Sequence, residues 1–273
     1  VFTFSIVTLI IAIAMQSTPF SIQAEDILGG LSFKFPTEHT ALALAVFGFT
    51  GISYGEIMAY TYWCKEKGYS NHDGDPKQVR NWIKTMQTDV WITVFLVTIG
   101  TIPFFLLGAS ILNSQGLYPP PNGDIIQTLL VMFTSILGEW ARWFFIPLTF
   151  FVLFSTFLSG TAAFTRTISD YFISMGLIVE KGNTRQTLIH YIAFLIPAFS
   201  CLAYFILPNP ILLLMIAGIW AALGLPIVNI GALYLVNKLD KELQPSNLTK
   251  IILTITLVFQ LGIAGLLIFS QMS

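Results

Sequence analysis

Charged residues are scarce in this chain. They make up 10% of its 273 residues, while 55% of the residues are hydrophobic and the mean hydropathy is +0.77. Soluble domains carry about 25% charged residues, so the composition excludes an ordinary soluble domain. Strands of alternating polarity, as in an outer-membrane barrel, are not visible either. The sequence therefore predicts an all-α integral membrane protein whose main partner is the lipid bilayer.

Motifs of enzymes and resident cofactors are also lacking. Cys64 and Cys201 lie in different apolar segments without disulfide or metal-ligand spacing, and His39, His72 and His190 fall in loops or at segment edges. The sequence contains no His-Glu-x-x-His, phosphate-binding glycine loop or nucleophile elbow. Its basic residues are too scattered for a nucleic-acid surface. We therefore expect no enzyme activity, no cofactor, no nucleic-acid partner and no obligate protein partner.

Long apolar runs separated by polar segments predict about seven transmembrane helices in a single transmembrane domain. The expected spans are Val1–Met15, Ala41–Cys64, Val90–Leu112, a segment within Trp140–Met175, Leu188–Leu207, Ile211–Val236 and Ile251–Phe269. Ile125–Leu137 is too short to cross and predicts an amphipathic or re-entrant helix. The first run begins without methionine or a positive flank, so we expect the chain to be the latter part of a longer membrane protein.

The basic residues are distributed unevenly among the loops. Eleven of the 13 Lys and Arg residues fall in the segments 65–85, 166–186 and 237–250, which are every second loop. Short loops rich in Lys and Arg remain in the cytoplasm. This pattern predicts a multi-pass protein of the plasma (inner) membrane with its carboxyl terminus outside.

The second span is interrupted in its middle, at Phe47–Glu56. Neither half, Ala41–Ile52 or Ile57–Cys64, reaches the roughly 17–25 residues needed to cross a membrane alone. A helix broken within the bilayer exposes backbone polar groups, which is tolerated only where they line a cavity or a site. Such glycine-containing breaks mark the binding sites of secondary transporters. We predict a substrate or ion pathway at Gly51, Ile52, Ser53, Tyr54, Gly55 and Glu56.

Glu56 is the acidic group of this break. A carboxylate near the bilayer centre costs at least about 2.5–3.5 kcal/mol, so it should face a cavity, a partner or a permeating ion. Alternatively, Glu56 lies nearer the cytoplasmic end and pairs with Lys65 or caps the second half-helix. Hydroxyls of Ser53 and Tyr54, with backbone carbonyls, suit hard cations such as magnesium, sodium or potassium. Tyr54 and Glu56 are therefore candidate metal ligands.

Polar groups in three further spans extend the prediction. Gly224, Pro226 and Asn229 interrupt the sixth span, either as part of the pathway or as a packing kink without a ligand. Candidate proton-pathway residues are Asp89, Arg166 and Asp170. The alternative for Asp89 is a helix-start role at the head of its span. The alternative for the other two, which lie one turn apart, is a salt bridge near the cytoplasmic end.

The order of several motifs resembles the natural-resistance-associated macrophage protein (Nramp) family of divalent-metal transporters. The matching segments are Ile27–Pro36, Gly48–Thr50, Thr88-Asp89, Leu158–Thr161 and Leu225-Pro226. The resemblance implies a LeuT-like fold of two inverted five-helix repeats and proton-coupled metal uptake by alternating access. The break in the second span would be that of the family's sixth helix. The family's first broken helix, with its Asp-Pro-Gly motif, would precede Val1.

Two sites of the sequence depart from the family pattern, a three-residue segment and a single glycine. The family's sixth helix reads Met-Pro-His where this chain has Ile52-Ser53-Tyr54, and a metal-binding glutamine of its tenth helix is replaced by Gly224. Without the thioether the site lacks the soft ligand that favours transition metals. We therefore predict transport of a divalent cation whose identity is open. The alternatives are an amino-acid or other organic-solute symporter on the same fold and a non-transporting membrane scaffold.

Overall fold

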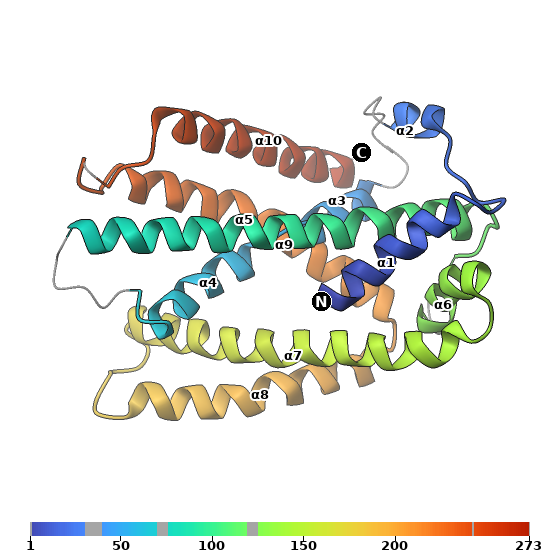
Figure 1. Cartoon of the computed structure of the whole chain (residues 1–273). Coiled ribbons are helices and arrows are strands. Elements are labelled where there is room, and N and C mark those ends of the chain that lie inside the picture. Colours follow the sequence, from blue (N-terminus) through green and yellow to red (C-terminus); the bar gives the residue numbers. More distant parts are fainter. Residues whose placement is uncertain (1, 31–39, 70–75, 119–124, 242, 273) are drawn as a thin grey trace. The chain divides into compact units, whose positions relative to one another are not determined.

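The computed structural model describes residues 2–30, 40–69, 76–118, 125–241 and 243–272, and these residues form helices without any strand. The elements are α1 (Phe2–Met15), α2 (Ala24–Gly30), α3 (Thr40–Phe49), α4 (Tyr54–Glu66), α5 (Pro76–Leu107), the π-helical turn η2 (Gly108–Asn113), α6 (Ile125–Leu137), α7 (Ala141–Ser174), α8 (Thr184–Ile206), α9 (Pro210–Val236) and α10 (Asn247–Met272) (Figure 1). The predicted all-α class is confirmed. His39 and His72 lie outside the described residues.

Six segments of the described chain are long and apolar enough to cross a membrane. One of them, Thr40–Glu66, contains both α3 and α4 and thus corresponds to the predicted broken span. The first predicted span is the 14-residue helix α1. The predicted short helix Ile125–Leu137 is α6, with the same bounds.

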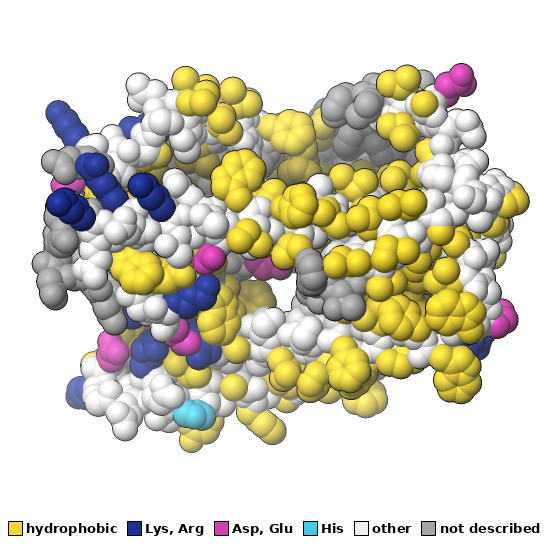
Figure 2. Space-filling view, in the orientation of Figure 1, with side chains coloured by type: hydrophobic (Ala, Val, Ile, Leu, Met, Phe, Trp, Pro, Cys, Tyr) yellow, Lys and Arg dark blue, Asp and Glu magenta, His cyan; other side chains and the backbone are white. Residues whose placement is uncertain are grey.

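The outer surface of these helices is apolar. Figure 2 shows hydrophobic side chains spread over much of the visible face. Large apolar side chains are exposed, including Trp143 at 84% and Phe205 at 83%. Soluble proteins rarely expose continuous apolar surface on this scale, whereas hydrocarbon solvates it. The protein is therefore an integral, multi-pass membrane protein.

The chain divides into two compact units. Unit 1 comprises residues 1–34 and 88–210, and unit 2 comprises residues 35–87 and 211–273. Helix α5 begins in unit 2 and continues into unit 1. The expectation of a single transmembrane domain stays a prediction, and the two units are described separately below.

Unit 1 has its core between α1, η2, α6 and α7. The rings of Phe133 and Phe145 lie 4.5 Å apart between centroids, and Met15, Ile111 and Met132 are completely buried beside them. The fully buried residues of α6 are Leu130, Met132 and Phe133. Helices α7 and α8 pack against each other as a second pair, running side by side in Figure 1.

Helix α5 begins earlier than the hydropathy predicts. Its first residue is Pro76, so three of the five basic residues of the expected loop 65–85 lie on the helix, and Asp89 lies well inside it. The helix-start role considered for Asp89 is therefore wrong. Half-buried Val79, Trp82 and Met86 recur at the helical period on one face, and this apolar stripe stabilises the first turns despite their charge.

Candidate functional site at a broken helix

Unit 2 contains the predicted break. Helix α3 ends at Phe49 and α4 begins at Tyr54, and the residues between them are not helical. The backbone amide and the hydroxyl of Thr50 both donate to the carbonyl oxygen of Val46, at 2.8 and 2.7 Å, which closes the last turn of α3. Gly51 then has a φ of +91°, a conformation open mainly to glycine. The chain is thus interrupted where the sequence predicts it.

Glu56 caps the second half-helix. Ser53 is the N-cap residue of α4, and its backbone N–H donates to Oε2 of Glu56 at 2.8 Å. The carboxylate therefore lies at the amino end of α4, where the helix dipole favours negative charge. Glu56 remains exposed. Lys65 is in the last turn of α4, about 13 Å further along the axis, so the structure selects the capping alternative over the pairing one.

The ring of Tyr54 packs directly on Gly224 of α9. A Cβ atom placed on Gly224 would lie 2.4 Å from Cδ1, 2.7 Å from Cγ and 2.8 Å from Cε1 of the ring. Distances below about 3 Å between such carbon atoms are strongly repulsive. Tyr54, from the first segment that departs from the family pattern, and Gly224, the second departure, are therefore direct neighbours in unit 2.

Helix α9 also contacts the first half-helix. A Cβ on Gly48 of α3 would lie 1.9 Å from the carbonyl oxygen of Gly218, and a Cβ on Gly218 would lie 2.8 Å from Cα of Ala45. Small residues at both positions let the two backbones approach closely. Helix α9 thus touches α3 through Gly218 and α4 through Gly224, one on each side of the break.

Asn229 joins α9 to α10. Its side chain, 7% exposed, donates through Nδ2 to Oε1 of Gln260 at 3.1 Å and to the carbonyl oxygen of Leu253 at 3.4 Å. Oδ1 of Asn229 is buried without a hydrogen-bond partner. Our sequence reasoning missed Gln260, although it is a polar residue within an otherwise apolar span.

The three candidate proton-pathway residues belong to unit 1. Asp170 of α7 forms a two-bond ion pair with Arg185 of α8, at 2.6 Å from Nε to Oδ1 and 3.1 Å from Nη2 to Oδ2. Arg166 donates from Nη1 to the carbonyl oxygen of Ala162 at 2.6 Å. The sequence did not indicate Arg185, because it follows Asp170 only after the loop between the two helices.

The donor atoms at the break are oxygens. Within the described part of the chain, no group of three or more His, Cys, Asp and Glu side chains is arranged to hold a metal. What the break offers is the hydroxyls of Ser53 and Tyr54, the carboxylate of Glu56 and the carbonyls at the end of α3. Hard cations take such ligands. A transported cation would be bound transiently and partly by backbone atoms, as at other helix breaks.

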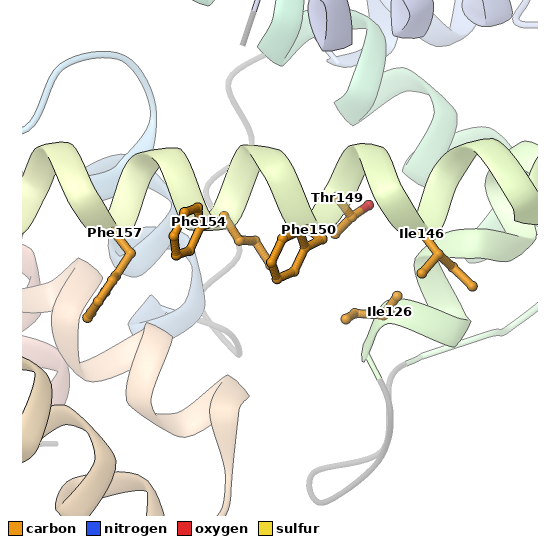
Figure 3. A pocket seen from close by; sticks show the side chains of 7 residues that line it. Ile126, Ile146, Thr149, Phe150, Phe154 and Phe157 are labelled. Carbon is orange, nitrogen blue, oxygen red and sulfur yellow. The ribbon is translucent and has the colours of Figure 1, made fainter.

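An apolar groove in unit 1 is a poor site for an ion. It runs along α7, where the rings of Phe150, Phe154 and Phe157 line it together with Ile126 of α6 (Figure 3). Thr149 contributes its one polar side chain. Transferring a charge into such surroundings is very unfavourable, so the groove suits hydrocarbon and not a cation.

The interruption predicted for the sixth span at Gly224, Pro226 and Asn229 is not present, because α9 is one continuous helix with Pro226 inside it. A polytopic helical membrane protein with one span broken at a glycine, and a second span packed across the break, has the architecture of a secondary transporter. The family comparison specifies the class. The model of the family described as natural resistance-associated macrophage protein-like matches residues 1–270. The chain therefore belongs to the Nramp family of divalent-metal transporters, which has the LeuT-like fold predicted from the sequence. Comparison with curated proteins and with solved structures gave no significant match.

Of the motifs that carry the resemblance, Gly48–Thr50 ends α3 and Leu225-Pro226 lies on α9, both in unit 2. Thr88-Asp89 and Leu158–Thr161 lie on α5 and α7 in unit 1. The first motif, Ile27–Pro36, is described only up to Gly30, in α2.

Proposed function

We propose that this protein is a secondary active transporter that moves a divalent metal cation, coupled to protons, by alternating access. The observation that carries the proposal is the break between α3 and α4, lined by oxygen donors. The carbonyl end of α3 carries the negative end of its helix dipole, which attracts a cation. The opposite field at the amino end of α4 is offset by the carboxylate of Glu56, 2.8 Å from the Ser53 amide.

The proposed pathway residues are those predicted from the sequence. The cation would pass Gly51, Ile52, Ser53, Tyr54, Gly55 and Glu56 at the break and Gly224 and Asn229 on α9. Tyr54 and Glu56 supply the side-chain oxygens. Asp89, Arg166 and Asp170 are the proposed proton-pathway residues of unit 1. They are ionisable groups on spanning helices, where charge is retained mainly for function.

The proposed orientation places the basic ends of the helices in the cytoplasm and the carboxyl terminus outside. In unit 2, Lys and Arg side chains gather near the start of α5 and the end of α9, at the left of Figure 2. Lys238 extends beside the ring of Tyr234, 5.4 Å from its centroid. An excess of Lys and Arg near helix ends favours the cytoplasmic side, which supports this orientation. The proposed location is the plasma (inner) membrane.

The test is cation uptake by the full-length protein reconstituted in liposomes. We expect uptake of manganese or magnesium, mutual competition between divalent ions, and acidification of the lumen that follows cation entry. Absence of competition among divalent ions would overturn the metal proposal. Uptake that leaves the internal pH unchanged would overturn proton coupling alone.

Glu56 offers a sharper variant. Glu56→Gln retains an oxygen that can accept the Ser53 hydrogen bond but removes the charge, whereas Glu56→Ala removes both. If the charge acts on the cation, both variants lose uptake. If Glu56 acts only as a cap, Glu56→Gln transports normally, and Glu56→Ala loses stability by about 0.5–2 kcal/mol.

An organic-solute symporter is the second candidate function, favoured by the absence of a thioether at the break. In such transporters the amino end of a half-helix binds a substrate carboxylate. Here a carboxylate of the chain itself, that of Glu56, already occupies the amino end of α4. Uptake of an amino acid with no uptake of divalent ions would favour this candidate. A non-transporting scaffold predicts no uptake of either, and normal function in Gly51→Leu and Glu56→Gln.

A further inference from the structure

Gly224 has no room for a side chain because the ring of Tyr54 fills the space beside it. Three adjacent ring atoms, Cγ, Cδ1 and Cε1, lie 2.7, 2.4 and 2.8 Å from the position of a Cβ on Gly224. Cγ lies next to the backbone of Tyr54, so a rotation of the ring's outer end would not relieve the overlap. A side chain at position 224 requires Tyr54 or α9 to move.

Exclusion of a side chain is not general along α9. Gly231, on the same helix, has no atom within 4 Å of its Cβ position. Tyr54 is the first residue of α4, directly after the N-cap Ser53 and before the buried Gly55. The capped start of α4 fixes the backbone from which the ring projects, so the ring is held against α9.

Glycine is common at helix interfaces in membrane proteins, where it allows close packing without any role in binding. A packing role predicts that changes at these positions alter stability alone. The position of the contact indicates a role at the proposed cation site as well, because Tyr54 borders the break and Gly224 lies on the helix that touches both half-helices. A ring held there decides which atoms can reach a cation at the break.

We infer that Tyr54 and Gly224 form a single specificity-determining pair. The Tyr54 ring occupies the volume of a side chain at position 224, so α9 contributes no side-chain ligand there. The side-chain donors along the proposed pathway are then oxygens of the break and of Asn229, which favours hard divalent ions over soft ones. This inference rests on the proposed cation transport and names its substrate class.

The experiment replaces the Tyr54 ring with a side chain at position 224 in the full-length protein. Tyr54→Ala opens the space beside Gly224. Gly224→Met or Gly224→Leu then refills it from α9, and methionine and leucine have similar volumes. Only methionine adds a soft sulfur ligand. The measurement is uptake in liposomes of magnesium and of cadmium, each competed by the other ion, together with the melting temperature in detergent.

We expect Gly224→Met and Gly224→Leu alone to lower the melting temperature and abolish uptake, and Tyr54→Ala to restore stability to both. Gly231→Leu, which enters open space, should leave the melting temperature near that of the unaltered protein. Relative to the Leu double variant, the Met double variant should prefer cadmium over magnesium by about tenfold or more, since one soft ligand is added.

Equal ion preference in the two double variants would overturn the inference, because position 224 would then not face the cation. Loss of all uptake in both would also overturn it, because the side chain at position 224 would then not replace Tyr54 beside the cation. Failure of Tyr54→Ala to restore stability would overturn the steric coupling itself. If the unaltered protein transports no divalent ion, the proposed function is wrong. If Tyr54→Ala nevertheless restores the melting temperature of the Gly224 variants, the pair is a packing contact without a role in ion specificity.

Discussion

Gly48 of α3 and Gly218 of α9 lie so close that a methyl group on the first would overlap the backbone of the second. The Cβ position of Gly48 is 1.9 Å from the Gly218 carbonyl oxygen and 2.8 Å from the Ala222 nitrogen. Both neighbours are backbone atoms, which cannot rotate away. The contact holds the first half-helix against α9 without any polar side chain.

Gly48→Ala should therefore destabilise the protein. Moving one helix to admit the methyl group should cost about 1–3 kcal/mol of folding free energy. The measurement is the melting temperature in detergent. Gly231→Ala on α9 is the matched control, because its methyl group enters open space and alanine favours the helix. Equal melting temperatures for the two variants would contradict the close approach.

Gly51 is constrained by its backbone and not by its neighbours. Its φ is +91°, and no atom lies within 4 Å of its Cβ position. Gly51→Ala should lower stability by about 1–2 kcal/mol, and Gly51→Asn by less, because asparagine tolerates positive φ. Gly160→Ala on α7, also in open space but helical, should be neutral or slightly stabilising. The same loss in the alanine and asparagine variants would rule out a backbone cause.

Asp170 and Arg185 should couple α7 to α8 energetically. Their side chains are 28% and 32% exposed and make two parallel hydrogen bonds. A double-mutant cycle of Asp170→Asn and Arg185→Gln should give a coupling of about 1 kcal/mol. Arg185→Lys should lose part of it, because lysine cannot form the paired bonds. The exposed pair of Glu139 and Arg142, 3.7 Å apart, is the control with a coupling near zero.

The buried amides of Asn229 and Gln260 should show strong non-additivity. Gln260→Leu removes the acceptor 3.1 Å from Nδ2 of Asn229 and leaves that donor with the carbonyl of Leu253 at 3.4 Å. An unsatisfied buried donor costs about 1–3 kcal/mol. The double variant Asn229→Leu, Gln260→Leu should be more stable than Gln260→Leu alone. Simple addition of the two single effects would show that the bond contributes little.

The interruption of the second span was predictable, because Gly48, Gly51 and Gly55 stand where a spanning helix carries large apolar residues. The early start of α5 was not predicted, because we read its lysines as loop residues and overlooked the half-buried stripe of Val79, Trp82 and Met86. Average hydropathy over a window hides such a stripe when charges occupy the other face.

Contacts between distant segments were the least predictable part of the candidate site. The sequence singled out both Tyr54 and Gly224 as departures from a family pattern, yet nothing in a linear chain shows that one fills the space of the other. Arg185 and Gln260 were missed for the same reason. Each acquires its role from a partner on another helix, and helical spacing relates only residues of the same helix.

The two contacts of α9 with the broken span also define a register. Gly218 and Gly224 are six residues apart, a rise of about 9 Å along a helix, and each must present its bare Cα in a different direction. Inserting one residue between them would turn the second contact by about 100° around the axis, so that Tyr54 would meet a side chain in place of Gly224. The phase of one helix thus sets the alignment of the two halves of another.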